Sequence, residues 1–149
     1  KQITKFFALA IVMIAFSANT FGQVTASATA TATIVTPIGI ANAGNMNFGN
    51  AAVSAVAGTV ILAPAGTRTT SGGVTLPATP GTVSAAHFSV TGTANFTYTI
   101  TLPSIATTVT SGGNTMTVDV FTSTPSGTGT LNGAGAETID VGATLNVGI

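Results

Sequence analysis

The fold class that this sequence predicts is all-β, with an antiparallel β-sandwich preferred over a barrel. Apolar and hydroxyl side chains alternate with a period of two through most of the chain after residue 22, which is typical of strands with one buried face. Turn signals rich in Gly, Pro and Ser recur at intervals of about ten residues. Good helix formers other than Ala are scarce in the same region.

The start of the chain has the three-part plan of a secretory signal peptide. Lys1 and Lys5 precede an apolar run over residues 6–18, and small residues stand before the expected cleavage site. The run is shorter than the roughly 20 apolar residues that a membrane-spanning helix needs. We therefore expect a signal-peptide helix over residues 1–22 and a single sandwich domain over residues 23–149. The mature chain is expected to be secreted or at the cell surface, without a membrane span.

The longest regular alternation opens the mature chain. Between residues 24 and 34 every even position is Val, Ala or Ile, and every odd position is Thr or Ser. This pattern predicts a half-buried strand that ends before Pro37. Such a strand could be an edge of the sandwich itself or a strand donated to another copy.

Later segments keep the same alternation. The clearest covers residues 95–102, where Phe96, Tyr98, Ile100 and Leu102 would share one face. Other strands are expected around apolar residues with the same spacing: Met46 with Phe48, Val60 with Leu62, Val74 with Leu76, Phe88 with Val90, Met116 with Val118 and Val120, Ile139 with Val141, and Leu145 with Val147. No linker interrupts the series, which predicts one domain.

Ionisable side chains are scarce. The 149 residues include three Lys or Arg, three Asp or Glu, one His and no Cys, and both lysines fall in the expected leader. A nucleic-acid-binding protein is excluded because phosphate neutralisation needs clustered cations. A polybasic membrane patch is excluded for the same reason. Since no disulfide can form, the domain must depend on core packing and backbone pairing.

The few ionisable residues are the candidates for acid–base or metal chemistry. His87 precedes the inward pair Phe88 and Val90, so a surface histidine is favoured over a catalytic base. The three carboxylates are Asp119, expected to point outward, and Glu137 and Asp140, which flank Ile139. They could gather around Ca²⁺, but no Asp-rich loop supports a metal site, and solvated strand-face carboxylates are favoured.

The remaining motifs are weak. Arg68 is expected to pair with a carboxylate or to cap a turn rather than to bind an anionic ligand. Gly127-Thr128-Gly129 lacks the Lys and the following helix of a phosphate loop. Asn95-Phe96-Thr97 matches a glycosylation acceptor but falls inside an expected strand. We therefore expect no enzymatic activity, no cofactor, and no catalytic, cofactor-binding or metal-binding residues.

Several motifs follow one another in order along residues 24–149. They are Met46-Asn47-Phe48-Gly49, Gly58-Thr59-Val60, Pro64-Ala65-Gly66-Thr67-Arg68 leading to Gly72-Gly73-Val74, Phe88-Ser89-Val90-Thr91-Gly92, and Tyr98-Thr99-Ile100-Thr101-Leu102-Pro103. This series resembles the secreted bacterial family of the domain of unknown function 4402. The resemblance implies an immunoglobulin-like sandwich in the style of fimbrial subunits, and it transfers no catalytic residues. Members usually continue into one more strand, so the chain is expected to lack its last strand.

An uncharged sandwich has few of the charged guards that normally keep edge strands from pairing. This favours a non-enzymatic structural or adhesive surface protein, such as a fibre or extracellular-matrix subunit that assembles by β-strand addition. Its partners would be copies of itself or other surface proteins. The alternative is a secreted carbohydrate-binding module. For that function Phe121 is the one ring expected to be exposed, since Phe48, Phe88 and Phe96 fit the core phasing.

Overall fold

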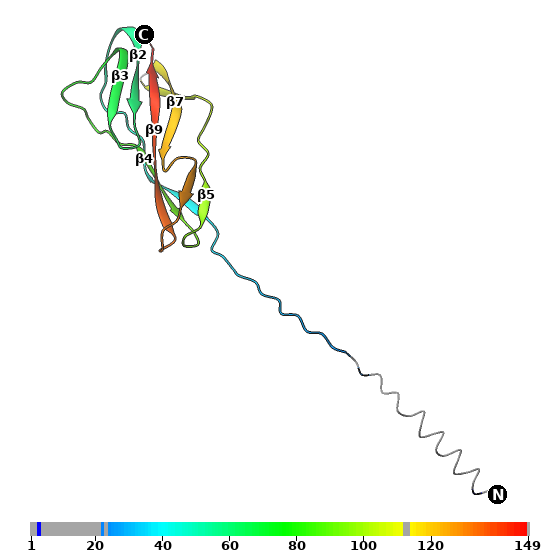
Figure 1. Ribbon diagram of the computed structural model, residues 1–149. Helices are drawn as coiled ribbons and strands as arrows, with labels where there is room; N and C mark the ends of the chain where they lie inside the picture. The colour runs from blue at the N-terminus through cyan, green and yellow to red at the C-terminus, as the bar shows by residue number, and fades with distance from the viewer. Residues whose placement is uncertain (1–2, 4–21, 23, 112–113, 149) are drawn as a thin grey trace. The chain divides into compact units, whose positions relative to one another are not determined.

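The computed structural model describes residues 3, 22, 24–111 and 114–148 (Figure 1). The chain divides into two units, Lys1–Thr33 and Ile34–Ile149. The predicted leader over residues 1–22 falls almost wholly outside the described residues, so the signal-peptide helix stays a prediction. In the described part of the chain, no helix is long and apolar enough to cross a membrane.

Within residues 34–149, the described residues fold as an antiparallel β-sandwich, which confirms the predicted fold class. The strands of the described residues are β1 Gly39–Gly44, β2 Ala52–Leu62, β3 Arg68–Thr75, β4 Ala86–Thr91, β5 Thr97–Thr99, β6 Thr107–Ser111, β7 Asn114–Thr124, β8 Thr128–Thr130 and β9 Ala136–Val147. A further strand beyond residue 149 stays a prediction.

β9 is the central strand of the larger sheet (Figure 1). One of its edges pairs with β7, which in turn pairs with β6. Along the other edge, the first half of β9 pairs with β4 and the second half pairs with β2. β4 pairs in turn with β1, and β2 pairs with β3. A second, two-stranded sheet pairs β5 with β8, and side chains from this layer pack on the β4–β9 half of the larger sheet.

The change of partner along β9 occurs at Gly142. Val141 pairs with Ala86 of β4, whereas Ala143 pairs with Leu62 of β2. Gly142 is buried, and a Cβ atom at this position would collide with the carbonyl oxygen of Leu62. The sheet can therefore branch here only because the residue has no side chain.

A β-bulge in β7 lies opposite the same part of β9. Two residues of β7, Val120 and Phe121, oppose a single residue of β9. Val120 has a φ of 46°, which is rare for a β-branched residue, and its side chain is exposed. The prediction that Val120 faces inward with Val118 is therefore wrong, because the extra residue changes the alternation and lets Phe121 pack inward.

Two clusters of buried side chains hold the sandwich together. The first core consists of Val60, Val74, Val118, Ala143 and Leu145 from β2, β3, β7 and β9. The second core consists of Ala86, Val90, Leu131, Ile139 and Val141, mainly from β4 and β9. Met46 and Phe121 pack against both clusters and so connect them.

The expected strand over residues 24–34 is not formed. Residues 24–33 have no regular secondary structure, and the side chains of Val24 and Ile34 are 97% and 98% exposed. An alternating segment becomes a strand only when another backbone pairs with it and a surface covers its apolar face. The alternation over residues 24–33 alone was therefore not sufficient to form a strand.

Other boundaries also differ from the predictions. The expected strand over residues 95–102 is reduced to β5, because Asn95 adopts a φ of 62° in the preceding turn. The expected strand at Met46 and Phe48 is limited to an isolated bridge between Asn47 and Ser84. The two short strands expected near the end of the chain form one continuous strand, β9, because both halves find partners on the same edge.

Candidate functional site

One side of the sandwich is open along β1. This strand pairs with β4 on one edge, and no other described strand pairs with it. Ile40 is paired with Val90 and so faces the same side of the sheet, yet Ile40 is 67% exposed and Val90 is 1% exposed. Ile38, just before β1, is 57% exposed. The second layer therefore does not extend over β1.

An apolar groove runs beside this strand. It consists of three adjoining hollows of about 240, 260 and 370 Å³. The first two share Ile38 and Tyr98, and the second and third share Ile40 and Ile100. We name it the β1 groove, with residues 35–40 along one wall and residues 96–103 along the other. Ile139 of the second core lies on its floor.

The opposite wall of the β1 groove also presents a free backbone edge. β5 pairs with β8 along one edge, and no other strand of the described residues pairs with it. The groove thus lies between two unpaired strand edges, one from each layer of the sandwich. This combination of apolar floor and unpaired backbone groups suits an extended peptide better than a compact small molecule.

A tyrosine–carboxylate hydrogen bond lies at the groove. The Tyr98 hydroxyl donates to Glu137 Oε2 at 2.7 Å. Burial, the hydrogen bond and the charge of Glu137 together raise the pKa of Tyr98 to about 12. Gly129 of β8 pairs with Tyr98, and a Cβ atom at that position would collide with the phenol ring. Gly127-Thr128-Gly129 therefore contributes to strand pairing and makes room for Tyr98.

The expectation that Glu137 is solvated on a strand face is wrong. Glu137 pairs with the buried Val90 and is itself half-buried. The sequence contained a signal for this position, because Glu137 stands two residues before Ile139 and a period of two places both on one face.

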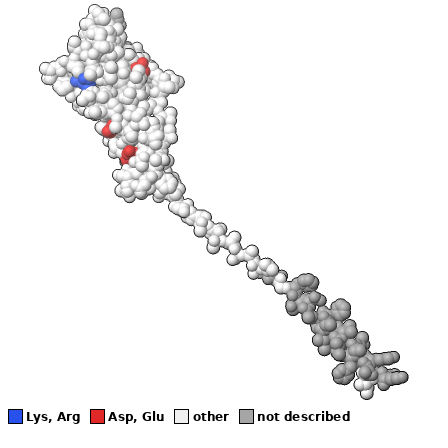
Figure 2. Space-filling model, in the orientation of Figure 1, with Lys and Arg blue, Asp and Glu red and all other residues white. Residues whose placement is uncertain are grey.

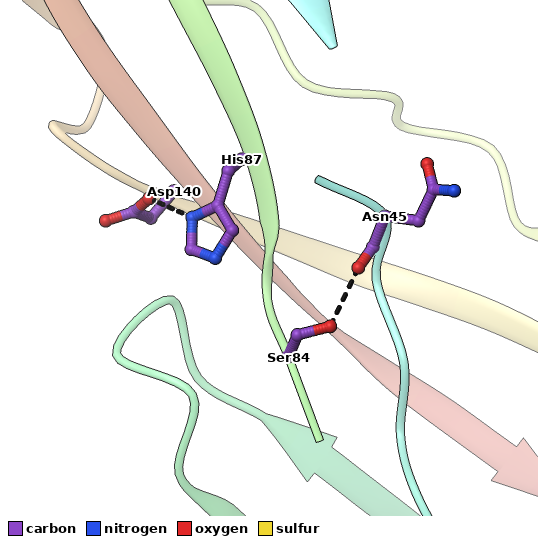
Figure 3. Close-up of polar contacts among 4 residues, drawn as sticks. All are labelled: Asn45, Ser84, His87 and Asp140. Atoms are coloured by element: carbon purple, nitrogen blue, oxygen red, sulfur yellow. Dashed lines mark hydrogen bonds and ion pairs between the residues drawn. The ribbon is translucent and has the colours of Figure 1, made fainter. Parts of the chain in front are cut away.

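The one histidine lies on the opposite, outer face of the sheet. His87 Nδ1 lies 2.6 Å from Asp140 Oδ1, and the two side chains are 43% and 36% exposed (Figure 3). The outward orientation of His87 is confirmed. Its pairing with Asp140 was not predicted, because it depends on the β4–β9 register that places the two residues directly opposite each other.

A serine lies near this pair but is engaged elsewhere. Ser84 Oγ donates to the carbonyl oxygen of Asn45 at 2.8 Å (Figure 3). Gly44 packs against the imidazole, since a Cβ atom there would lie 3.0 Å from His87 Cδ2. His87 lines none of the hollows that form the β1 groove. The geometry thus gives a cross-strand pair on an open surface, without the nucleophile–base hydrogen bond of a hydrolase.

The other charged residues are dispersed, and Figure 2 shows only small, scattered charged areas on a largely uncharged face. Arg68 Nη1 donates to the carbonyl oxygens of Phe48 and Asn50, the latter at 2.8 Å, and so ties β3 to the loop that precedes β2. Asp119 is half-buried, and its Oδ1 has no hydrogen-bond partner among the described residues. Within the same residues, no group of three His, Cys, Asp or Glu could hold a metal ion.

The exposed ring of the sandwich is not the one predicted. Phe121 packs against both cores, because the β7 bulge turns it inward. Phe96 is instead 54% exposed and lines one end of the β1 groove. It precedes β5 and follows the turn at Asn95, so the strand alternation assumed from the sequence does not reach it.

Comparison with known families gave a match over most of the chain. The model of the family described as domain of unknown function (DUF4402) matches residues 38–149. This region contains the whole set of strands from β1 to β9. Comparisons with curated proteins and with solved structures gave no match.

Proposed function

The chain belongs to the DUF4402 family, and we propose that it is a non-enzymatic, secreted or cell-surface structural or adhesive protein that assembles by β-strand addition. The observation that carries this proposal is the β1 groove. There the unpaired edge of β1 lies beside inward-facing isoleucines that remain exposed. An added strand could pair with the edge and cover the apolar floor in one step.

The energetics favour an occupied groove. The side chains of Ile38 and Ile40 are both more than half exposed, although Ile40 lies on the inward face of the sheet. Removing apolar surface from water stabilises a complex by roughly 25 cal/mol per Å². Contiguous apolar surfaces of this kind mark interaction sites on many proteins. No Lys lies beyond the expected leader, so no lysine guards the β1 edge.

The dispersed ionisable groups support a non-enzymatic role. His87 and Asp140 form an exposed pair, and the hydroxyl of Ser84 is occupied by a backbone carbonyl. Glu137 is engaged by Tyr98 at the groove, on the other face of the sheet from His87. An acid–base site would need such groups to converge on one substrate position.

Assembly can be tested by light scattering after size-exclusion chromatography, over a range of concentrations, with negative-stain microscopy of the same material. We expect concentration-dependent oligomers or fibres. Ile40→Asp should abolish them, because a carboxylate would enter an apolar interface. Ile61→Asp is the matched control, since Ile61 is an exposed strand isoleucine on the outer face. A wild-type chain that stays monomeric at high concentration would contradict the proposal.

A carbohydrate-binding module is the second candidate, and one observation favours it. Phe96 is exposed beside Tyr98 at one end of the β1 groove, and a ring face can stack on the C–H groups of a sugar. A glycan array tests this function directly. Glycan binding that is lost in Phe96→Ala would support a carbohydrate-binding function, and an array without any binding would contradict it.

A further inference from the structure

We propose that the strand added to the β1 groove is residues 24–34 of a second copy of this chain, with its even-numbered side chains on the groove floor. This inference rests on the proposed function, because it names the donor for the assembly described above. It is carried by two independent features of the molecule: an open acceptor groove and an unpaired segment of matching chemistry.

The donor segment has the pattern of a strand but none of its contacts. Its even positions are apolar from Val24 to Ile34, and its odd positions all carry hydroxyl groups. Both of its large apolar side chains are almost fully exposed, at 97% and 98%. No strand is assigned over residues 24–33. A segment with this alternation forms a stable strand only when its backbone pairs with another strand and its apolar face is covered.

The groove and the segment fit in length and chemistry. Eleven extended residues span about 36 Å, which exceeds the roughly 26 Å spanned by the eight residues of the wall at 96–103. The segment contains no ionisable residue, and Glu137 beside the groove is already engaged by Tyr98. Pairing with β1 would bury alanine, valine and isoleucine side chains against the second core and leave Thr and Ser in water.

A second copy is favoured over the segment of the same chain. The hydroxyl of Thr93 accepts a hydrogen bond from the Thr36 backbone N–H at 2.8 Å and donates to the Thr36 carbonyl at 3.2 Å. Residues 35–38 are thereby held along the end of the groove. To enter its own groove, the segment would have to reverse direction within these residues and release Thr36. A donor from another copy leaves this anchor intact.

Cysteine crosslinking tests the donor and its orientation, and the native chain contains no cysteine to interfere. One preparation carries Ile40→Cys in the groove. A second set carries single substitutions at even positions, Ala28→Cys and Ala30→Cys, or at odd positions, Thr29→Cys and Thr31→Cys. The full chains are mixed with oxidised glutathione, and heterodimers are measured by non-reducing electrophoresis and mass spectrometry. Ile61→Cys replaces Ile40→Cys as the acceptor control.

We expect heterodimers at least about tenfold more abundant for the even positions than for the odd ones, because disulfide geometry requires Cβ atoms within about 4.5 Å. The same donors should give only background with Ile61→Cys. Equal yields at even and odd positions, or equal yields with both acceptors, would overturn the inference. Circular dichroism of each variant establishes that the sandwich is folded before mixing.

The proposed assembly and the donor assignment are contradicted by different results. If the wild type assembles but no even position crosslinks to Ile40→Cys, the donor assignment is wrong while strand-addition assembly stands. If the wild type is monomeric at every concentration, the proposed assembly fails and the donor assignment fails with it. A monomer in which the double variant Ala30→Cys with Ile40→Cys closes an internal disulfide would show that the segment fills its own groove, which overturns the choice of a second copy.

Discussion

The two cores of this sandwich are built from the same kinds of aliphatic side chains, but only one of them is closed. Val60, in the first core, is fully buried on β2, which has a strand on each side, and Leu62 of the same strand is also fully buried. Ile40, at the second core, keeps two thirds of its surface in water on β1, which has one neighbour. An inward-facing position is therefore not the same as a covered one, and the uncovered part is where a partner can bind.

The largest difference between the two regions should appear in core truncations. Leu62→Ala should lower the free energy of unfolding by about 2–5 kcal/mol, because it leaves a cavity in a packed site. Ile40→Ala should lower it by less than about 1 kcal/mol in the monomer, because the side chain is already hydrated. Urea unfolding of dilute protein measures both values. Equal losses would contradict the picture of one closed and one open core.

The junction between the two regions can be broken at Gly142. Gly142→Ala should lower the free energy of unfolding by about 1–3 kcal/mol, because the new methyl group must displace the backbone of β2 at Leu62. Gly133→Ala is the control, since nothing lies within 4 Å of a Cβ atom there. If both substitutions are tolerated equally in thermal unfolding, the branch does not depend on glycine.

The polar contact at the open core predicts a pH dependence. The pKa of Tyr98 is raised from 10.0 to about 12, so the folded state holds the phenol proton more tightly than the unfolded state does. The stabilisation is complete below pH 10 and is lost as the pH rises toward 12.

Near-ultraviolet absorbance of the phenolate can follow this titration, because the chain has one Tyr and no Trp. The midpoint should lie near 12 in the folded protein and fall in Glu137→Gln, while burial still holds it above 10. A folded-state midpoint at 10 would contradict the hydrogen bond between Tyr98 and Glu137.

The smallest effect is expected on the outer face. Replacing His87 or Asp140 by Ala should change the free energy of unfolding by roughly 0.2–1 kcal/mol, since contacts between exposed polar side chains contribute little. A double-mutant cycle at neutral pH measures the coupling between the two side chains. A coupling of several kcal/mol would mean that this pair is part of a more buried site than the structure describes.

The residue pattern was sufficient to predict a layered β-fold and to predict whether many side chains face inward or outward. The inward phase of Val60, Leu62 and Val90 and the outward phase of His87 follow from an alternation of two. The same reasoning failed at Val120 and Phe121, because a bulge adds one residue to β7 and shifts the alternation beyond it. It also misplaced Phe96, which lies outside the strand in a region shaped by the turn at Asn95.

The candidate site was less predictable than the fold. The unguarded edge was expected from the lack of charge, but the position of that edge was not, because β1 has a weak pattern of its own over Gly39–Gly44. The pairs His87 with Asp140 and Tyr98 with Glu137 join residues 53 and 39 positions apart. Such contacts depend on strand register and layer packing, which nearby residues do not specify.

Alternation and composition were enough to specify an all-β protein with few charged groups, because both are local properties of the chain and do not depend on the partner strands. The identity of the open edge strand and of the exposed inward side chains depends instead on how the strands pair and pack in three dimensions. β9 has just two edges, and β4 and β2 divide one of them at Gly142. β1 is consequently left at the end of its branch, where the second layer does not reach.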